Sequence, residues 1–169
     1  LVATSVALSD AAPRSDLLLL VHPGSECRCE CDRRDSRARV ANALSIRSNL
    51  SLPDVITTTM WERVFLAPSG GEALAAVRDE LVIAGPGREA RLGEQLALIH
   101  EDFDVVLIDC APALDLLTSN ALAAADGVLI VTQSKLLSTT GLAHLLNTIS
   151  VARHYLNPTL CVVGVLVNM

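Results

Sequence analysis

The most informative stretch of the sequence is Phe103-Asp104-Val105-Val106-Leu107-Ile108-Asp109-Cys110-Ala111-Pro112. Its four consecutive apolar residues, three of them β-branched, are typical of a strand buried on both faces of a sheet. An acid, small residues and a proline end the strand. A carboxylate at the carboxyl end of a parallel strand lies where open α/β sheets bind their ligands. The pattern alone is equally compatible with an acid that merely ends a strand.

Strands and helices alternate along most of the chain. This alternation predicts right-handed crossovers in an α/β fold, a mostly parallel sheet with helices on both faces. The expected strands are 17–21, 63–67, 104–109, 128–132 and 161–167. The expected helices are 72–81, 88–100, 114–125 and 138–155, with shorter ones at 3–12, near 37–48 and after Pro53.

Composition narrows the class of protein. With 169 residues, 51% of them hydrophobic and 2% aromatic, the chain fits one domain with an aliphatic core, which suits a helix-covered parallel sheet. The net charge of −6 gives no general attraction to nucleic acid or to an anionic membrane. No apolar run approaches the roughly 20 residues of a membrane helix, and no signal peptide is visible. We therefore expect a cytoplasmic protein.

The spacing of the cysteines and the scarcity of lysine argue against two common kinds of site. The alternating Cys27, Cys29 and Cys31 do not have the C-x2–4-C spacing of zinc sites, so metal binding there is not favoured. Cys110 and Cys161 are expected to act as small apolar residues. A P-loop requires a Gly-Lys pair, but the single lysine is Lys135, which follows a serine. The 169 residues therefore contain no standard P-loop.

The residues after Asp109 continue Cys-Ala-Pro-Ala-Leu-Asp-Leu-Leu-Thr-Ser-Asn-Ala-Leu (110–122), followed by Gly-Val-Leu-Ile-Val-Thr-Gln (127–133) and Gly-Leu (141–142). This stretch resembles the ParA-type partition ATPases, a deviant Walker A P-loop family related to MinD. The resemblance covers about residues 52–169 and is densest over 103–149. Residues 86–92 resemble the family segment before the helix that precedes the Asp109 strand. The resemblance implies a P-loop NTPase-like fold.

The resemblance also implies roles for particular residues. Asp109 resembles the Walker B acid, a catalytic residue that positions magnesium through water. Cys110 and Pro112 lie in the family's switch segment beside the nucleotide, Gln133 matches a Gln after the next strand, and Asn168 matches an adenine-contacting Asn. The implied cofactors are ATP and Mg²⁺. Alternatively, Gln133 satisfies a strand end and Asn168 belongs to a loop. Asp115, where the family usually has Gly, is expected to cap a helix.

The resemblance implies a bacterial protein of plasmid or chromosome partition. The complete protein, of which these residues would be a part, would form a homodimer, bind non-specific DNA at the nucleoid and respond to a ParB-type partner. No membrane would be involved. We expect residues 1–169 to be a single partial domain, divergent or poorly ordered over 22–50 and family-like over 52–169. The family's phosphate-binding loop would precede Leu1, and further helices would follow Met169. Without that loop, ATP binding should be weak and turnover negligible. The alternatives are a non-catalytic interaction module or a non-functional gene remnant.

Overall fold

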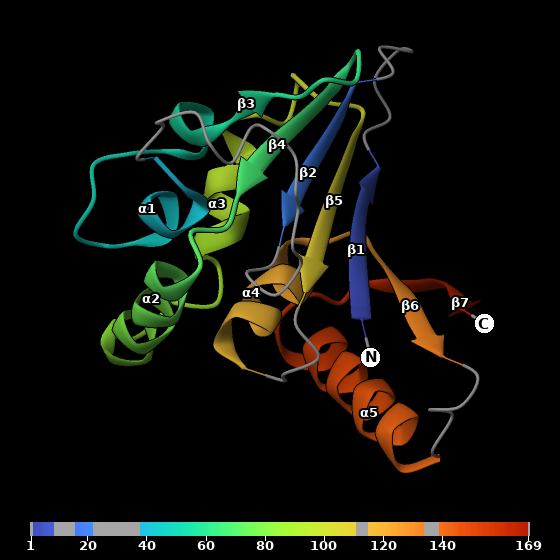
Figure 1. The fold of residues 1–169 in the computed structure, drawn as a ribbon. Helices are drawn as coiled ribbons and strands as arrows, with labels where there is room; N and C mark the ends of the chain where they lie inside the picture. The colour runs from blue at the N-terminus through green and yellow to red at the C-terminus, as the bar shows by residue number, and fades with distance from the viewer. Residues whose placement is uncertain (1, 9–15, 22–37, 111–114, 134–138, 169) are drawn as a thin grey trace.

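A seven-stranded sheet forms the centre of the computed structural model, which describes residues 2–8, 16–21, 38–110, 115–133 and 139–168 (Figure 1). The strands lie in the order β3-β4-β2-β5-β1-β6-β7. Their bounds are β1 (Val2–Leu8), β2 (Leu17–Val21), β3 (Thr57–Thr58), β4 (Val64–Pro68), β5 (Val105–Cys110), β6 (Gly127–Gln133) and β7 (Cys161–Asn168).

The predicted α/β fold with a mostly parallel sheet is confirmed, but helices were expected on both faces of the sheet and the described helices cover only one. β2 pairs in parallel with β4 and β5, and β6 pairs in parallel with β7. All five strands expected from the sequence are present, with ends shifted by at most one residue. The two-residue strand β3, which was not predicted, pairs antiparallel with β4 and forms a hairpin at one side of the sheet.

The prediction of a helix over residues 3–12 is wrong, because Val2–Leu8 form the strand β1. β1 lies between β5 and β6 and runs antiparallel to both. The β-branched residues Val2, Thr4 and Val6 alternate along it, as suits a strand. The backbone N–H and C=O groups of β5 and β6 on the sides that face β1 need hydrogen-bond partners. This requirement overrides the local tendency of residues 2–8 to form a helix. Residues 9–12 lie outside the described residues.

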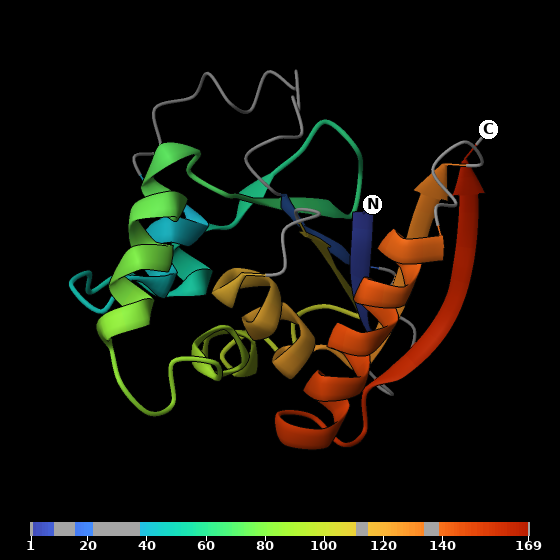
Figure 2. The same ribbon diagram turned by 90° about the horizontal axis from the view of Figure 1, so that it is seen from below.

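The described helices pack against one face of the sheet (Figure 2). Val106, Ile108 and Cys110 of β5 are buried on this face. The ladder through β1 places Val128 and Ile130 of β6 on the same face. The helices are α1 (Val40–Leu44), the 3-10 helix η2 (Leu52–Val55), α2 (Glu72–Ile83), α3 (Arg91–Ala97), α4 (Leu116–Ala124) and α5 (Thr139–Tyr155).

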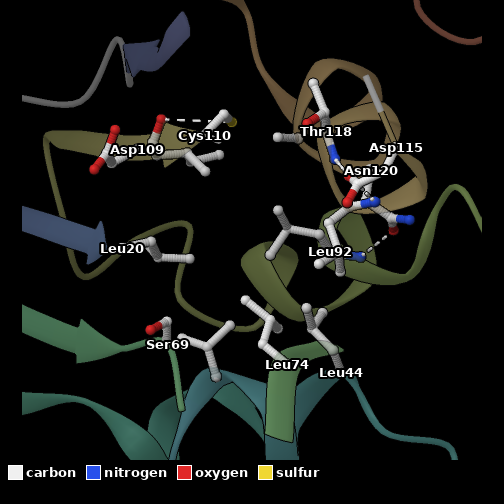
Figure 3. Close-up of a pocket in the computed structure, with 14 residues that line it drawn as sticks. Leu20, Leu44, Ser69, Leu74, Leu92, Asp109, Cys110, Asp115, Thr118 and Asn120 are labelled. Carbon is white, nitrogen blue, oxygen red and sulfur yellow. Dashed lines mark hydrogen bonds between the residues drawn. The ribbon is translucent and has the colours of Figure 1, made fainter. Parts of the chain in front are cut away.

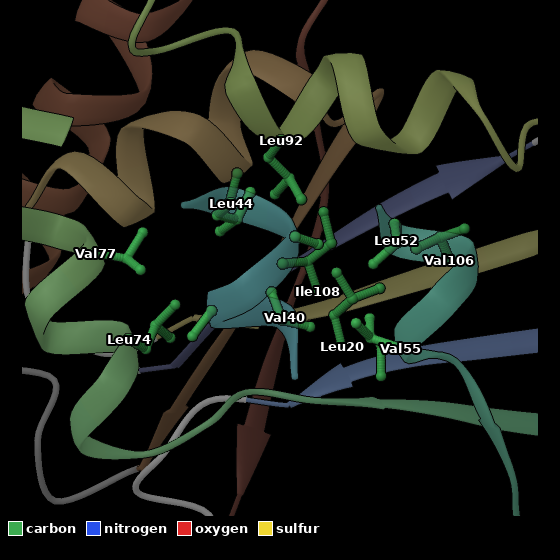
Figure 4. Packing of buried hydrophobic residues seen from close by; sticks show 14 of the residues in the cluster. Leu20, Val40, Leu44, Leu52, Val55, Leu74, Val77, Leu92, Val106 and Ile108 are labelled. Carbon is green, nitrogen blue, oxygen red and sulfur yellow. The ribbon is translucent and has the colours of Figure 1, made fainter. Parts of the chain in front are cut away.

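Two clusters of buried aliphatic residues form the core. The larger cluster joins β2 and β5 to α1, η2, α2, α3 and one side of α4 (Figure 4). The smaller cluster joins β6 to α5 and to the other side of α4. Because Ala121 belongs to the first cluster and Leu122 to the second, α4 connects the two halves of the core.

Several helices are shorter than expected. The sequence predicts a helix over 88–100, whereas α3 spans only Arg91–Ala97. The helices expected near 37–48 and after Pro53 are the five-residue α1 and the four-residue η2. None of the described helices combines the length and the apolarity needed to cross a membrane.

Candidate functional site

The parallel strands all end at one edge of the sheet, which we call the carboxyl edge. Val21, Pro68, Cys110, Gln133 and Asn168 are the last residues of the strands β2, β4, β5, β6 and β7. β5 ends near the middle of this edge, between β2 and β1. Asp109, the predicted Walker B acid, therefore lies at the position where open α/β sheets bind ligands.

The Asp109 side chain faces away from the helix-covered core. Successive residues of a strand point to opposite faces, and Ile108 and Cys110 point into the core. Asp109 is half-buried, and its carboxylate points away from the apolar side chains beneath it (Figure 3). No hydrogen bond or ion pair joins this carboxylate to another of the described residues. Its oxygens are therefore available to water or to a cation.

Cys110 presents its thiol to the core. The Sγ lies 3.8 Å from the backbone oxygen of Ile108, and the side chain is 7% exposed. A nucleotide contact by Cys110 would therefore have to come from its backbone. Pro112, the other switch residue named from the sequence, lies outside the described residues.

Gln133 and Asn168 are brought together by the sheet. The ladder between β6 and β7 pairs them directly as the last residues of these strands. Both lie farther along the sheet than Asp109, which is level with Leu129 through Thr4 of β1. Gln133 comes four positions after Leu129, so the pair lies about 13 Å beyond Asp109 along the strand direction. Asp109 therefore lies at one part of the carboxyl edge, and the pair formed by Gln133 and Asn168 lies at another.

Asp115 caps the helix that follows Asp109. Its Oδ1 accepts hydrogen bonds from the backbone N–H groups of Leu117 and Thr118, each at 3.1 Å. The residue has extended backbone angles, as is usual at an N-cap. The predicted capping role is therefore confirmed, and α4 begins at Leu116.

A small cavity lies between the end of β5 and the helices (Figure 3). It has a volume of about 70 Å³. Leu20, Leu44 and Leu74 line it from one side, while residues at the beginning of α4 line it from the other. The lining is mostly apolar, so this cavity is a gap in side-chain packing beside the carboxyl edge.

Asn120 is a polar residue to which the sequence reasoning gave no role. It is 1% exposed and sits in the middle of α4. Its Oδ1 accepts a hydrogen bond from the backbone N–H of Leu92 at 3.1 Å, and its Nδ2 donates to the carbonyl oxygens of Arg88 at 2.9 Å and Leu116 at 3.0 Å. An Asn in the middle of a predicted helix is a poor helix former, and this signal could have indicated a specific contact.

The segment before α3 carries a local ion pair. Arg88 Nε lies 2.9 Å from Glu89 Oε1, and this hydrogen bond is the main cause of a lowered pKa of the Glu89 carboxyl. Arg88 Nη1 also donates to the carbonyl oxygen of Val82 near the end of α2, at 2.9 Å. These contacts fix Arg88 against α2.

The donor chemistry at the carboxyl edge suits magnesium held mainly by water and phosphate. Magnesium takes oxygen ligands, keeps several waters and commonly uses one or two protein carboxylates together with substrate phosphates. Asp109 supplies one such carboxylate. The described residues contain no cluster of three or more His, Cys, Asp or Glu that could hold a metal ion by itself. Cys27, Cys29 and Cys31 lie outside the described residues.

Comparison of the sequence with known proteins gives consistent matches. The AAA domain family matches residues 24–162. The chain is 39% identical over 116 residues to the sporulation initiation inhibitor protein Soj of Bacillus subtilis, covering 69% of this chain and 45% of Soj. It is 45% identical over 82 residues to the chromosome partitioning protein ParA of Myxococcus xanthus, covering 48% of this chain and 29% of that protein. The chain thus spans less than half the length of these relatives.

The fold is also similar to solved structures. Cobyrinic acid a,c-diamide synthase from Mycobacterium smegmatis, solved with a bound ATP analogue and magnesium, has a TM-score of 0.80 and 31% sequence identity to this chain. The similarity covers 91% of this chain and 62% of that chain. The α/β sheet described above is therefore found in a protein that binds nucleotide and magnesium.

Proposed function

We propose that this chain, which belongs to the ParA-type partition ATPases of the AAA domain family, forms the magnesium-facing part of a nucleotide site at its carboxyl edge. The observation that carries the proposal is the position of Asp109, half-buried at the end of β5 with no described partner for its carboxylate. The solved relative with an ATP analogue and magnesium supports the choice of ligand.

Each residue of the proposed site has a distinct task. Asp109 holds the waters around magnesium and thereby orients the phosphates, and magnesium when bound neutralises part of their charge. The segment that contains Cys110 and Pro112 lies beside the phosphates. Gln133 and Asn168, adjacent at the ends of β6 and β7, belong to the adenine end of the proposed site.

The wider biological role follows from the family. We place the intact protein in a partition system for a plasmid or chromosome, where it binds ATP, forms a homodimer, associates with DNA of the nucleoid and responds to a ParB-type partner in the cytoplasm. The names of the relatives support this role. Residues 1–169 contain no Gly-Lys pair, so by themselves they should bind Mg²⁺–ATP weakly and hydrolyse it negligibly.

Titration with a fluorescent ATP analogue, with and without magnesium, tests the proposed site. The expected result is weak binding that requires magnesium and is lost in Asp109→Asn. Asp79→Asn is the matched control, because it removes the same charge from an exposed side chain of α2. Binding that is indifferent to magnesium, binding that survives Asp109→Asn, or no binding at millimolar nucleotide would overturn the proposal.

A further inference from the structure

The Asn120 carboxamide joins two helices through three backbone groups. Oδ1 accepts from Leu92 N–H, and Nδ2 donates to the carbonyls of Arg88 and Leu116. Both donor hydrogens and the acceptor oxygen of the amide are therefore used. A fully satisfied amide at this degree of burial is a specific link, since a buried polar group without partners would be strongly unfavourable.

The link takes the place of a helical hydrogen bond. In an α-helix that began at Arg88, the N–H of Leu92 would donate to the carbonyl of Arg88, four residues earlier. Here the Asn120 amide stands between these two groups and bonds to each of them. This insertion explains why α3 begins at Arg91 although the sequence predicts a helix from residue 88.

The surroundings of α4 combine this link with a nearby gap in side-chain packing. On one side, α4 is tied through Asn120 to Arg88, which is itself fixed to the end of α2 by the bond from Nη1 to Val82. The cavity of about 70 Å³, which Asn120 itself also lines, lies between the beginning of α4 and the side chains of Leu44 and Leu74. A packing gap holds a helix less firmly than a filled interface does.

We infer that Asn120 is a positioning residue that holds α4 against residues 88–92. The inference rests on the proposed function only in assigning a nucleotide to the carboxyl edge. Asn120 holds the first turn of α4 in register with the end of β5 and keeps α3 one turn short. Loss of the amide allows Arg88 and Leu92 to bond to each other, and α4 is then free to shift toward the cavity.

Nuclear magnetic resonance of Asn120→Leu tests this inference without any ligand. The expected changes are a shift of the Cα resonances of residues 88–90 toward helical values and at least tenfold faster hydrogen exchange of the Leu117 and Thr118 amides. Asn157→Leu is the matched control. Asn157 donates to the carbonyls of Leu122 and Ala125 near the other end of α4, so its loss should leave residues 88–90 and the first turn of α4 unchanged.

A merely structural role for Asn120 predicts a different result. Amide hydrogen exchange would then become faster throughout the protein, including in β6, while the Cα resonances of residues 88–90 would not shift. This pattern would overturn the inference. If Asn120→Leu fails to fold, Asn120→Ser provides the second variant, because its shorter hydroxyl cannot bridge Arg88 and Leu92, and the same shifts are expected.

Nucleotide binding provides a separate readout. Asn120→Leu should weaken the magnesium-dependent binding of a fluorescent ATP analogue several-fold, whereas Asn157→Leu should not. If Asn120→Leu and Asn157→Leu bind the ATP analogue equally well, Asn120 does not position the nucleotide site. If the unaltered protein binds no nucleotide, the proposed function fails, while the resonance shifts still decide whether Asn120 positions α4.

Discussion

Asp115 determines where α4 begins after the end of β5. The first amides of a helix have no partners within the helix, and this carboxylate accepts from two of them, Leu117 N–H and Thr118 N–H. The carboxylate also interacts favourably with the positive end of the helix dipole. One side chain therefore sets the start of the helix next to the proposed nucleotide site.

Replacement of Asp115 by Ala should destabilise the protein by about 1 kcal/mol, the usual cost of losing an N-cap. Asp115→Asn should retain most of the stability, because Asn caps helices about as well. Urea unfolding followed by circular dichroism measures both variants. Equal stability of the Ala variant and the unaltered protein would show that the cap contributes nothing here.

Asp54 makes stability depend on pH. Its Oδ2 accepts from the Ser51 hydroxyl at 2.6 Å and the Ser51 N–H at 2.8 Å, and these bonds lower the pKa of the Asp54 carboxyl, the hydroxyl contributing most. A carboxyl with a lowered pKa in the folded state stabilises the protein above its unfolded pKa. This contribution is lost as the pH falls through the folded value.

Unfolding measured between about pH 5 and pH 2 should therefore show a smaller acid-induced loss of stability in Asp54→Asn than in the unaltered protein. Ser51→Ala removes the stronger of the two hydrogen bonds, so the loss of its unfolding free energy with falling pH should be intermediate. If the free energy of unfolding falls equally with pH in all three proteins, the Asp54 carboxyl does not contribute to the pH dependence.

Residues with local signals were predictable, and residues with distant partners were not. Asp109 follows a buried strand and Asp115 precedes an apolar helix, so the sequence indicated both positions. The partners of Asn120 in α3 and in the turn before it, Leu92 and Arg88, lie 28 and 32 residues away, and nothing nearby in the sequence specifies them. Sequence reasoning therefore placed the acid of the candidate site but missed the amide that links α3 to α4.

Helices and strands that are specified by their own residues were predictable, whereas those that depend on distant partners were not. β2, β5 and β6 are apolar runs that end in clear turn signals, and each was expected within one residue of its bounds. β1 was expected to be helical, because its strand conformation depends on partners from residues 105–110 and 127–131. α3 was expected to begin earlier, because the competing hydrogen bonds come from another helix.

The junction between β6 and β7 is tightly packed at Gly127. A Cβ added at Gly127 would overlap Val163 Cγ2, whereas a Cβ at Gly164 would meet Leu129 Cδ1 at 3.8 Å, an ordinary contact. The two glycines lie on neighbouring strands of the same ladder. They therefore provide a matched pair for testing this interface.

Gly127→Ala should destabilise the protein by about 1–3 kcal/mol, the usual cost of overpacking. Gly164→Ala should change stability by less than about 1 kcal/mol, because the site has room for a methyl group. Thermal unfolding of the two variants measures the difference. A Gly127→Ala variant as stable as Gly164→Ala would show that β7 is not held against β6 as described.

At the level of the whole molecule, two elements join the halves of the structure. β1 connects the β3-β4-β2-β5 part of the sheet to β6 and β7, and α4 contributes to both core clusters. The alternating pattern and aliphatic composition predicted the α/β class. The strand order was not predictable from local pattern, because the position and direction of β1 depend on contacts far apart in the sequence.

Locating the bound metal on the folded protein tests most directly whether Asp109 forms part of a magnesium–nucleotide site. Manganese(II) replaces magnesium in the presence of ATP, and its paramagnetism broadens the amide resonances of nearby residues. We predict that the resonances of Asp109 and Cys110 at the carboxyl edge broaden first and that Asp109→Asn abolishes the effect. Broadening centred on Asp104 and Asp126, which precede β5 and β6 at the opposite edge, would contradict it.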